Sequence, residues 1–418
     1  MSLLVTDGTL LTQDDERRVV KGNLLTEKDR IRAVGGAEGS ADRTLDATGC
    51  LVIPGLVNGY TRAAHVLLGP PQDQPWGDMA EAMASLQSNL TKRDLEVAAA
   101  LAVTEMLASG TTCFLDLFVW EEEVGRAVSQ AGIRAHLAWA VTADEDLPLA
   151  RRFLHKMQGR DRIQALVGAT ELSQPQQIKA LAVLAREEGT RWCLPLSERR
   201  SDVYGFQRAT GRRPVEWLER EGFLSPEFLA FHGVWLTLNE IRALARNQVP
   251  VIHCPGSNQM TGAGGPMPLP EMLREGVVVG LGTDSPFLSG SLSLRAAMGT
   301  CGHIHRGTRG DPTVLPAQTL LDLGTRGGAQ AFGLRTGHLQ RGAPADFVVL
   351  ETGMTSSDPV EESLSLLAYG GRALRVRDVV VAGKLVVEGG RVMAFDLADL
   401  QARVGEVRRE LGLAHSRD

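Results

Sequence analysis

Three side chains that can exchange protons, those of Glu198, His232 and Asp284, each stand at the end of a short apolar run. A carboxylate and an imidazole that are held close together can act as a general acid and a general base. Each residue also has an ordinary structural explanation. Glu198 beside Arg199 and Arg200 suits a solvated charge cluster, His232 suits a core histidine bonded to a carbonyl, and Asp284 suits a turn cap. The elements that carry these side chains decide between the two explanations.

The central part of the chain alternates short apolar runs with amphipathic stretches. Residues 92–107 and 174–188, for example, carry apolar side chains at spacings of three and four, as the outer helices of a barrel do. Eight candidate inner strands predict an α/β fold, a (β/α)8 barrel of the TIM type, whose chemistry lies at the carboxyl ends of its strands. These strands are residues 52–58, 111–116, 133–140, 163–168, 191–196, 228–232, 249–253 and 278–283.

Both ends of the chain have a different texture, with short alternating strands separated by turn residues. We predict that residues 1–53 and 339–395 meet as one composite β-sandwich beside the barrel, which occupies residues 54–338. The last segment, residues 396–418, has helical spacing over 396–411 and is predicted to form a surface helix and a tail.

The composition excludes several functional classes. The net charge of −6 and the scattered Lys and Arg residues give no basic surface for nucleic acid. No apolar run approaches the ~20 residues that a membrane helix needs, and the N-terminus lacks the pattern of a signal peptide. Five cysteines without a C-x-x-C pair indicate reduced thiols. We therefore expect a cytoplasmic protein that acts on a small molecule.

The first barrel segment carries a recognisable motif. The string from Pro54 to Arg62, P-G-L-V-N-G-Y-T-R, resembles the P-G-x-x-N-x-H-T-H motif of the metal-dependent amidohydrolase superfamily. The similarity is to the subgroup of cytosine, guanine and S-adenosylhomocysteine deaminases and triazine chlorohydrolases. Its members hydrolyse non-peptide C–N bonds or related bonds, and the resemblance implies the same inherited activity class here. Tyr60 and Arg62 stand where the family has two histidines that bind the metal.

Later motifs extend the resemblance over nearly the whole chain. Pro195 and Glu198 align with the family's H-x-x-E, in which the histidine binds metal and the glutamate shuttles protons. His232 matches the histidine that polarises water or substrate. Asp284, in G-L-G-T-D, matches an aspartate that both binds metal and accepts the proton of water. The resemblance therefore implies that Glu198, His232 and Asp284 are the catalytic residues.

Further residues are predicted to contact a ligand. His253, Ser257 and Asn258 are similar to the family's H-x-P-x-S-N, and they either bind ligand or brace the loop by hydrogen bonds. Trp76 stands in a proline-rich loop, residues 69–79, which is predicted to cover the barrel mouth, although the tryptophan equally suits core packing.

Three of the four metal ligands that the family uses are replaced, by Tyr60, Arg62 and Pro195, and Asp284 alone is retained. A catalytic zinc site needs three protein ligands with N, O or S donors. We therefore expect no metal cofactor, although zinc or iron serves in relatives, and even His65 with His232 would require a remodelled site. Arg62 is instead expected to pair with Asp284, with Tyr60 donating a hydrogen bond nearby.

Three functions remain open at this stage. The chain is a metal-free enzyme acting on an activated heterocycle, a catalytically inactive pseudoenzyme that binds a small polar ligand or a protein partner, or a hydrolase with a relocated metal site. Tyr60, Arg62, Trp76, His253, Ser257 and Asn258 are the predicted ligand-binding set. Homo-oligomer formation is implied by the resemblance.

Overall fold

The computed structural model describes residues 2–36, 40–70, 73–172, 174–352, 359–369 and 374–413, without the side chains of 359–361. Residues 71 and 72 of the predicted covering loop and the predicted tail at 414–418 lie outside the described residues. So do residues 353–358 and 370–373, within the segment predicted as the second half of the β-sandwich.

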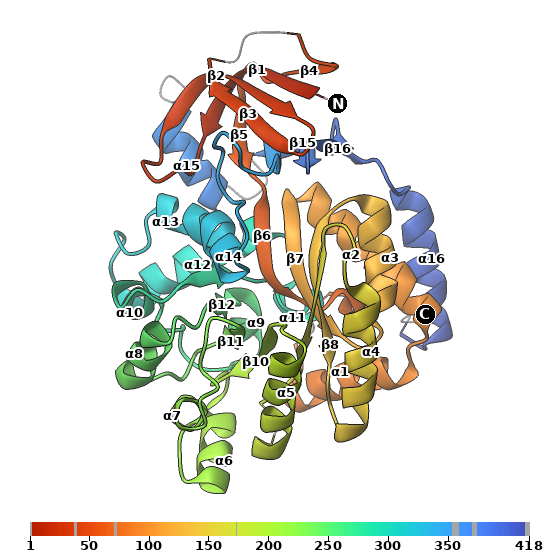
Figure 1. Cartoon of the computed structure of the whole chain (residues 1–418), viewed down its shortest axis with the longest axis vertical. Helices are drawn as coiled ribbons and strands as arrows, with labels where there is room; N and C mark the ends of the chain where they lie inside the picture. Colours follow the sequence, from red (N-terminus) through yellow and green to blue (C-terminus); the bar gives the residue numbers. More distant parts are fainter. Residues whose placement is uncertain are drawn as a thin grey trace.

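The centre of the fold is a nearly closed barrel of eight parallel strands (Figure 1). Its strands follow one another in chain order, and backbone amides of Thr283 and Asp284 donate to the carbonyl oxygen of Tyr60, at 3.1 and 2.9 Å, to join the last strand to the first. The predicted barrel is confirmed. Its strands are β6 (Leu56–Thr61), β7 (Thr111–Phe118), β8 (Arg134–Ala140), β9 (Ile163–Gly168), β10 (Trp192–Leu196), β11 (Phe228–His232), β12 (Val251–His253) and β13 (Val279–Leu281).

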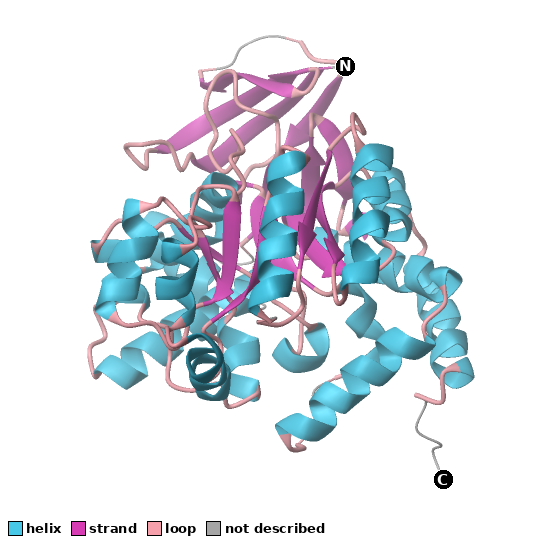
Figure 2. Ribbon diagram, turned by 60° about the horizontal axis from the view of Figure 1, so that its bottom comes forward, coloured by secondary structure: helices cyan, strands magenta, loops and turns pink. Residues whose placement is uncertain are grey.

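Helices cover the outside of this barrel (Figure 2). The helix predicted at 92–107 is α2, and it begins where the Thr91 hydroxyl accepts from the Asp94 amide in a capping box. Along the chain the helices are η1 (Ala63–Leu68), α1 (Trp76–Asn89), α2 (Lys92–Ala108), α3 (Glu121–Ala131), η2 (Asp144–Asp146), α4 (Leu147–Met157), α5 (Pro175–Glu187), α6 (Arg200–Thr210), α7 (Pro214–Arg220), α8 (Leu238–Arg246), α9 (Pro255–Met260), α10 (Leu269–Arg274), α11 (Pro286–Ser289), α12 (Leu294–Arg309), α13 (Ala317–Asp322), η3 (Leu323–Gly327) and α14 (Gly328–Ala331).

Strands from both ends of the chain form a second, nine-stranded sheet beside the barrel. The order is β17-β16-β15-β14-β5-β1-β2-β3, with β4 paired to β1, so β14 from the C-terminal part lies next to β5 from the N-terminal part. The strands are β1 (Ser2–Leu11), β2 (Val19–Glu27), β3 (Arg30–Gly35), β4 (Arg43–Asp46), β5 (Cys50–Pro54), β14 (Phe347–Glu351), β15 (Arg375–Val381), β16 (Lys384–Glu388) and β17 (Arg391–Val392).

The prediction of one strand over residues 52–58 is wrong. Residues 50–54 pair with β1 and β14 in the second sheet, and only residues 56–61 enter the barrel. Gly55 lies between the two strands, where a Cβ atom would collide with the side chain of Thr112. Apolar residues continue on both sides of Pro54 and Gly55, and both strands are fully buried, so the pattern of apolar residues does not reveal the division.

Two helices follow the last barrel unit. The helix α15 (Pro359–Tyr369) packs against α12 and α13. It lies within residues 339–395, which were predicted to be β-structure, so the prediction is wrong for this part of the segment. The predicted surface helix is α16 (Leu397–Glu410), which packs on α2 (Figure 1).

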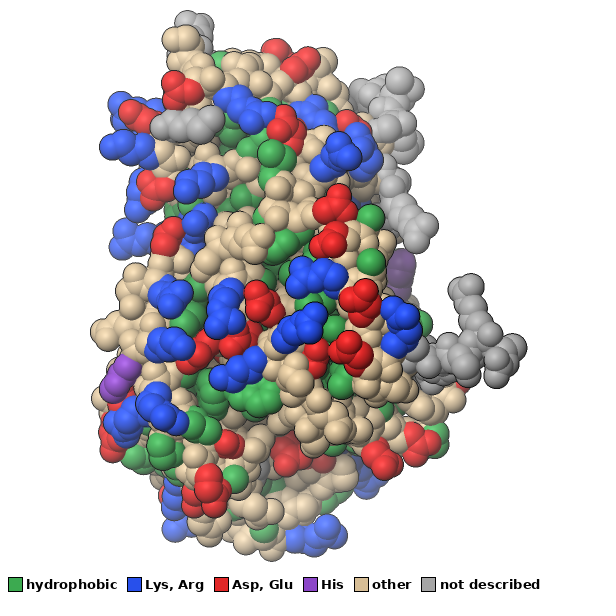
Figure 3. Space-filling model, turned by 90° about the vertical axis from the view of Figure 1, so that its right-hand side faces the viewer, with side chains coloured by type: hydrophobic (Ala, Val, Ile, Leu, Met, Phe, Trp, Pro, Cys, Tyr) green, Lys and Arg blue, Asp and Glu red, His purple; other side chains and the backbone are tan. Residues whose placement is uncertain are grey.

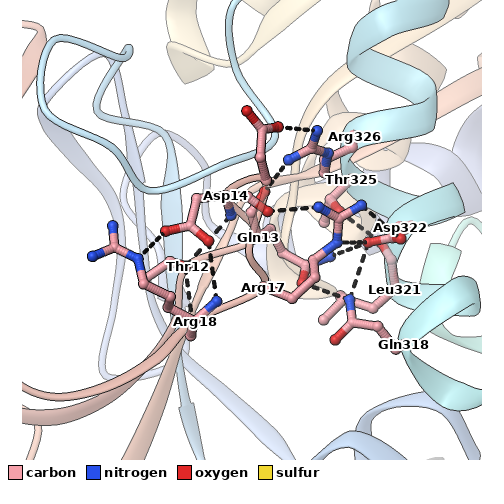
Figure 4. A network of polar contacts seen from close by, with 11 residues as sticks. Thr12, Gln13, Asp14, Arg17, Arg18, Gln318, Leu321, Asp322, Thr325 and Arg326 are labelled. Carbon is pink, nitrogen blue, oxygen red and sulfur yellow. Dashed lines mark hydrogen bonds and ion pairs between the residues drawn. The ribbon is translucent and has the colours of Figure 1, made fainter.

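A polar network connects the second sheet to the barrel (Figure 4). The Asp322 carboxylate, at the end of α13, accepts two hydrogen bonds from the Arg17 guanidinium, at 2.8 and 2.9 Å. It also accepts from the side-chain amides of Gln13 and Gln318. A paired, planar guanidinium fixes orientation as well as distance, so the loop after β1 is held in one position relative to the barrel.

Acidic and basic side chains are interspersed on the face drawn in Figure 3, so neither sign of charge dominates that face. Within the described part of the chain no helix has the length and apolarity to cross a membrane. All five cysteines are buried and free. The cytoplasmic location remains a prediction.

A buried ion pair gives a first test of how the two sheets depend on each other. The Arg134 guanidinium at the start of β8 donates to the Asp346 carboxylate, at 2.7 Å, and the Asp346 side chain is fully buried. The Ala382 amide and the Thr336 hydroxyl also donate to this carboxylate. Asp346→Ala leaves these donors unpaired and is expected to lower the free energy of unfolding by about 3–5 kcal/mol, measured by urea denaturation.

The matched control removes an exposed pair. Glu187→Gln removes the ion pair between Glu187 and Arg151. The side chain of Arg151 is 44% exposed and that of Glu187 is 53% exposed. The substitution is expected to change the free energy of unfolding by less than ~1 kcal/mol. Equal effects of the two substitutions would contradict a role for Asp346 in joining the sheets.

Candidate active site

Three strand ends have an unusual backbone conformation. Ser197, His232 and Asp284, after β10, within β11 and after β13, have φ angles of +50°, +72° and +54°. Left-handed backbone costs a non-glycine residue roughly 1 kcal/mol, and such residues gather where a site requires a particular side-chain direction. The strained positions thus mark the carboxyl end of the barrel as the candidate site.

A cavity of about 450 Å³ opens at this end. Catalytic candidates Glu198, His232 and Asp284 all line it, as do Arg62 and Trp76 from the predicted ligand-binding set. Pro195 also lines it, and so do His65 and Arg199. The structure therefore brings together the three proton-exchanging side chains that the sequence places 34 and 52 residues apart.

Arg62 places its guanidinium within the cavity wall. Its Nε lies 3.5 Å from Asp284 Oδ1, in a pair whose side chains are only 17% and 5% exposed. A second nitrogen donates to the carbonyl oxygen of Thr170 at 2.9 Å. Burial alone would lower the pKa of Arg62, but Tyr60 and Asp284 outweigh it and raise this pKa, so the guanidinium remains charged. The expected pairing of Arg62 with Asp284 is confirmed.

Tyr60 lies beneath this cation and differs from the prediction in one respect. Its hydroxyl oxygen accepts a hydrogen bond from Arg62 Nε at 2.7 Å, where a donated bond was expected. The reversal follows from chemistry, because a guanidinium has donors and no acceptor. The ring stacks on Phe231, with centroids 4.1 Å apart, and burial raises the pKa of Tyr60 well above its ordinary value. Tyr60 therefore supports Arg62 as a neutral phenol.

His232 is held from behind and faces Glu198 in front. Its Nδ1 lies 2.7 Å from the Asn258 side-chain oxygen, which as an acceptor places the ring proton on Nδ1. Its Nε2 lies 3.7 Å from Glu198 Oε2. An imidazole beside a carboxyl group is suited to proton transfer.

The remaining members of the H-x-P-x-S-N motif brace the structure. The Ser257 hydroxyl donates to the Cys254 carbonyl in the first turn of α9, and Asn258 orients His232. His253 is 2% exposed, and its ring lies next to His305 of α12. None of the three lines the cavity. Of the two roles that the sequence left open for them, the geometry favours bracing.

Sequence reasoning missed a stacked pair at the cavity edge. The guanidinium carbon of Arg199 lies 3.6 Å from the centroid of the Trp76 ring, at the beginning of α1. A cation over an indole face is an attractive contact. Arg199 and Trp76 are more than a hundred residues apart, so no local spacing could have indicated the contact.

A second missed group is a pair of buried acids below Arg62. Asp116 of β7 accepts from the Thr61 hydroxyl and the Ala63 amide at 2.8 and 2.7 Å, and thereby fixes the chain on both sides of Arg62. The carboxyl group of Glu121, in α3, lies beside it. Burial raises the pKa of Asp116 to about 6 and that of Glu121 well above its ordinary value. The signal in the sequence was one aspartate inside an otherwise apolar strand.

The donor set can be compared with what a catalytic zinc ion needs. Tyr60 is a neutral phenol bonded to Arg62, Arg62 is a cation without a lone pair, and Pro195 offers no side-chain donor. His65 is neutral, because burial and then Arg62 lower its pKa, but its Nδ1 contacts the Ser285 hydroxyl at 2.9 Å. These residues do not fit a zinc site of the family type, and the Arg62 charge lies against the carboxylate that such an ion would use.

Another cavity, of about 560 Å³, lies at the opposite end of the barrel. It is lined by residues at the amino ends of β8, β9 and β10 and by none of the predicted site residues. Since barrel enzymes carry their chemistry at the carboxyl ends of the strands, the smaller cavity is the better candidate.

Comparison with known proteins agrees with the motifs. A model of the amidohydrolase family matches residues 51–386. The chain belongs to the amidohydrolase family. A 5-methylthioadenosine/S-adenosylhomocysteine deaminase of Nitratidesulfovibrio vulgaris is 34% identical to this amidohydrolase, with 97% of both chains covered. A 5'-deoxyadenosine deaminase of Methanosarcina mazei is 32% identical, with 94% of both covered.

Solved structures share the fold of this amidohydrolase. An adenosine deaminase of Xanthomonas campestris with bound zinc superimposes with a TM-score of 0.91, at 25% identity and 99% coverage of both chains. An atrazine chlorohydrolase of Arthrobacter aurescens, complexed with zinc, gives a TM-score of 0.87 at 22% identity, over 97% of this chain and 100% of the other. The predicted family and fold are confirmed.

The contact between Arg62 and Asp284 predicts strong energetic coupling. Arg62→Met and Asp284→Asn should each lower the free energy of unfolding by about 3 kcal/mol, because each leaves a buried polar group without its partner. The double variant should lose less than the sum by at least ~1 kcal/mol. Urea denaturation of the four proteins measures this difference. The exposed pair of Arg375 and Glu351, 60% and 37% exposed, is the control and should show coupling below ~1 kcal/mol. Additive losses at Arg62 and Asp284 would contradict the pairing.

The buried Asp116 predicts a pH dependence of stability. Its folded pKa of about 6 is above the ordinary value of 3.8, so the folded state holds the proton more tightly than the unfolded state. Stability from this group is therefore full below about pH 4 and is lost as the pH rises through about 6. Asp116→Asn mimics the neutral acid and should flatten this decline, which thermal unfolding between these pH values measures. The exposed Asp144→Asn is the control, and identical pH profiles for the wild type and Asp116→Asn would contradict the assignment.

Proposed function

We propose that this amidohydrolase hydrolyses a C–N bond of a small heterocycle at the barrel mouth without a metal ion. The observation that carries the proposal is the cavity in which Glu198, His232 and Asp284 remain together while the charge of Arg62 lies 3.5 Å from Asp284. A buried carboxylate needs a compensating cation. Arg62 supplies that charge from the protein itself.

A purine nucleoside is the substrate class that we propose. The support is the identity of 32–34% to deaminases of methylthioadenosine, S-adenosylhomocysteine and 5'-deoxyadenosine. The cavity of about 450 Å³ lies within the ~300–1,000 Å³ range of small-molecule sites. Trp76, capped on one face by Arg199, offers an aromatic wall, and Glu198 offers a hydrogen-bonding group for a ring nitrogen.

The retained residues have complementary roles in the proposed reaction. Asp284 accepts a proton from water as its oxygen attacks the ring carbon that bears the amino group. Glu198 donates a proton to the adjacent ring nitrogen, and His232 hydrogen-bonds the attacking water through Nε2. Arg62 stabilises the negative charge that develops on the water oxygen. The C–N bond then breaks, and ammonia leaves with the proton that Asp284 had accepted. The oxygen stays on the ring carbon as a carbonyl, and its remaining proton passes to Glu198, which regains its acid form.

Energetics limit the rate of this reaction. A zinc ion can lower the pKa of water from ~15.7 to ~7, which corresponds to roughly 12 kcal/mol at ~1.36 kcal/mol per pKa unit. A guanidinium supports hydroxide far less. We therefore expect slow turnover.

A second candidate is a pseudoenzyme that binds the same ligands, or a protein partner, without turnover. The ion pair between Arg62 and Asp284 favours it, because the carboxylate that would accept the proton of water is already engaged with a cation.

Ammonia release separates the two candidates. Purified protein is incubated with methylthioadenosine, S-adenosylhomocysteine and 5'-deoxyadenosine in the presence of a chelator, and binding is followed by thermal shift. The enzyme proposal expects slow ammonia release. Asp284→Asn should reduce the rate of this release at least about 100-fold, because the general base is lost. Stabilisation by a nucleoside without ammonia would favour the pseudoenzyme. A tightly held metal ion that Asp284→Asn removes would contradict both.

A gain of metal provides the converse arm of this test. The variant Tyr60→His, Arg62→His and Pro195→His restores three imidazoles next to Asp284, and it should hold about one zinc ion per chain more than the wild type. After dialysis, the zinc content of the triple variant is compared with that of the single Pro195→His variant. If the triple variant folds and takes up no more zinc than the single variant, these positions do not correspond to the family's metal ligands.

A further inference from the structure

A separate group of metal-binding side chains lies away from the cavity. His253 at the end of β12 and Cys301 and His305 of α12 have donor atoms that all lie within 4.8 Å of one another. All three side chains are buried, with exposed fractions of 2%, 0% and 0%. Cys301 and His305 are four residues apart on one helix, so their side chains share a face. None of the three lines the cavity at the barrel mouth.

The rings are poorly satisfied by protein contacts alone. His253 Nε2 and His305 Nε2 face each other at 3.5 Å, at the outer limit of a hydrogen bond. The Nδ1 atoms of both rings have no hydrogen-bond partner within the described part of the chain. Four buried ring nitrogens thus obtain one long contact, although buried polar atoms are normally paired.

The separation of the two nitrogens suits a shared ion. Two imidazole nitrogens that are ~2.05 Å from one ion at the tetrahedral angle lie ~3.3 Å apart, and a thiolate sulfur at ~2.3 Å lies ~3.5 Å from each nitrogen. The observed 3.5 Å between nitrogens is close to this arrangement. Bringing the sulfur from within 4.8 Å to bonding position requires a movement of about 1 Å, within the reach of side-chain torsions.

We propose that His253, Cys301 and His305 bind one soft, closed-shell metal ion, Cu⁺ or Zn²⁺. Two imidazoles and a thiolate are the donors that such ions prefer, whereas Ca²⁺ and Mg²⁺ require oxygen ligands. Binding displaces the thiol proton of Cys301 to solvent, and the sulfur–metal bond forms in its place. With Cu⁺ the complex of two neutral imidazoles and one thiolate is uncharged, which suits a site without exposed surface. With Zn²⁺ one positive charge remains.

The position of this site gives it a role in support of the catalytic centre. It joins the end of β12 to α12, and His253 is followed directly by Cys254 and α9. In that short helix Asn258 holds His232. An ion here would fix the loop that orients His232 without contacting the cavity itself.

Metal titration of the whole chain tests the proposal. Reduced, metal-free protein is given Zn²⁺ or Cu⁺ alone, dialysed and analysed for bound metal. The proposal expects about one ion per chain with at least one of the two metals, and at least tenfold less in the Cys301→Ser and His305→Gln variants. His303→Gln is the matched control, because His303 lies on the same helix but is exposed and packs on Tyr369. Asp284→Asn should also keep the ion, which separates this site from the barrel mouth.

A spectroscopic readout does not depend on the folding of the variants. Co²⁺ bound to the wild-type chain should show the intense near-ultraviolet absorption of a cobalt–thiolate bond, and its uptake should raise the Tm. Binding of neither Zn²⁺ nor Cu⁺, cobalt uptake without the thiolate band, or metal content equal in wild type and Cys301→Ser would overturn the proposal. Each result would indicate a packed cysteine beside two hydrogen-bonded imidazoles.

Discussion

The guanidinium of Arg62 and the carboxylate of Asp284 face each other at the mouth of the barrel, where both are largely removed from water. Neither charge would be stable there alone, because desolvation of an unpaired ion is expensive. Around this pair the other contacts follow: Tyr60 accepts from Arg62, the Thr170 carbonyl accepts from its second nitrogen, and the Asp284 amide, just after β13, donates to the Tyr60 carbonyl. The positive charge beside Asp284 therefore comes from a side chain of the protein itself.

The barrel makes this arrangement possible by closing on itself. Two amides after the last strand donate to the Tyr60 carbonyl, so the first and last strands place Arg62 and Asp284 side by side. Ser197, His232 and Asp284, at the ends of β10, β11 and β13, have left-handed backbone, and His232 and Asp284 line the cavity. Such local strain persists because the surrounding hydrogen bonds over-determine each position. Beneath Arg62 the Asp116 carboxyl group fixes the chain before and after it.

The relatives of this chain include deaminases, and one related solved structure contains zinc. Deaminases at 32–34% identity span nearly the whole chain, and an adenosine deaminase solved with zinc shares its fold. In this chain the positive charge beside Asp284 is the guanidinium of Arg62. A guanidinium is permanently charged and directional, whereas a metal ion also activates a bound water molecule. The proposed function therefore assigns proton transfer to Glu198 and His232 beside Arg62 and expects slow turnover.

The sequence by itself determined the barrel, the second sheet from both termini and the strand-end positions of Glu198, His232 and Asp284, because periodicity and short motifs record which side chains a strand buries and which it presents at its end. It also indicated that Arg62 compensates Asp284, since a buried carboxylate requires a partner. Only the tertiary structure divided residues 50–61 between two sheets at Gly55 and placed Arg199 over Trp76. It alone brought His253 to Cys301 and His305. These relations depend on contacts between residues far apart in the chain, and no local pattern of apolar and polar residues encodes them.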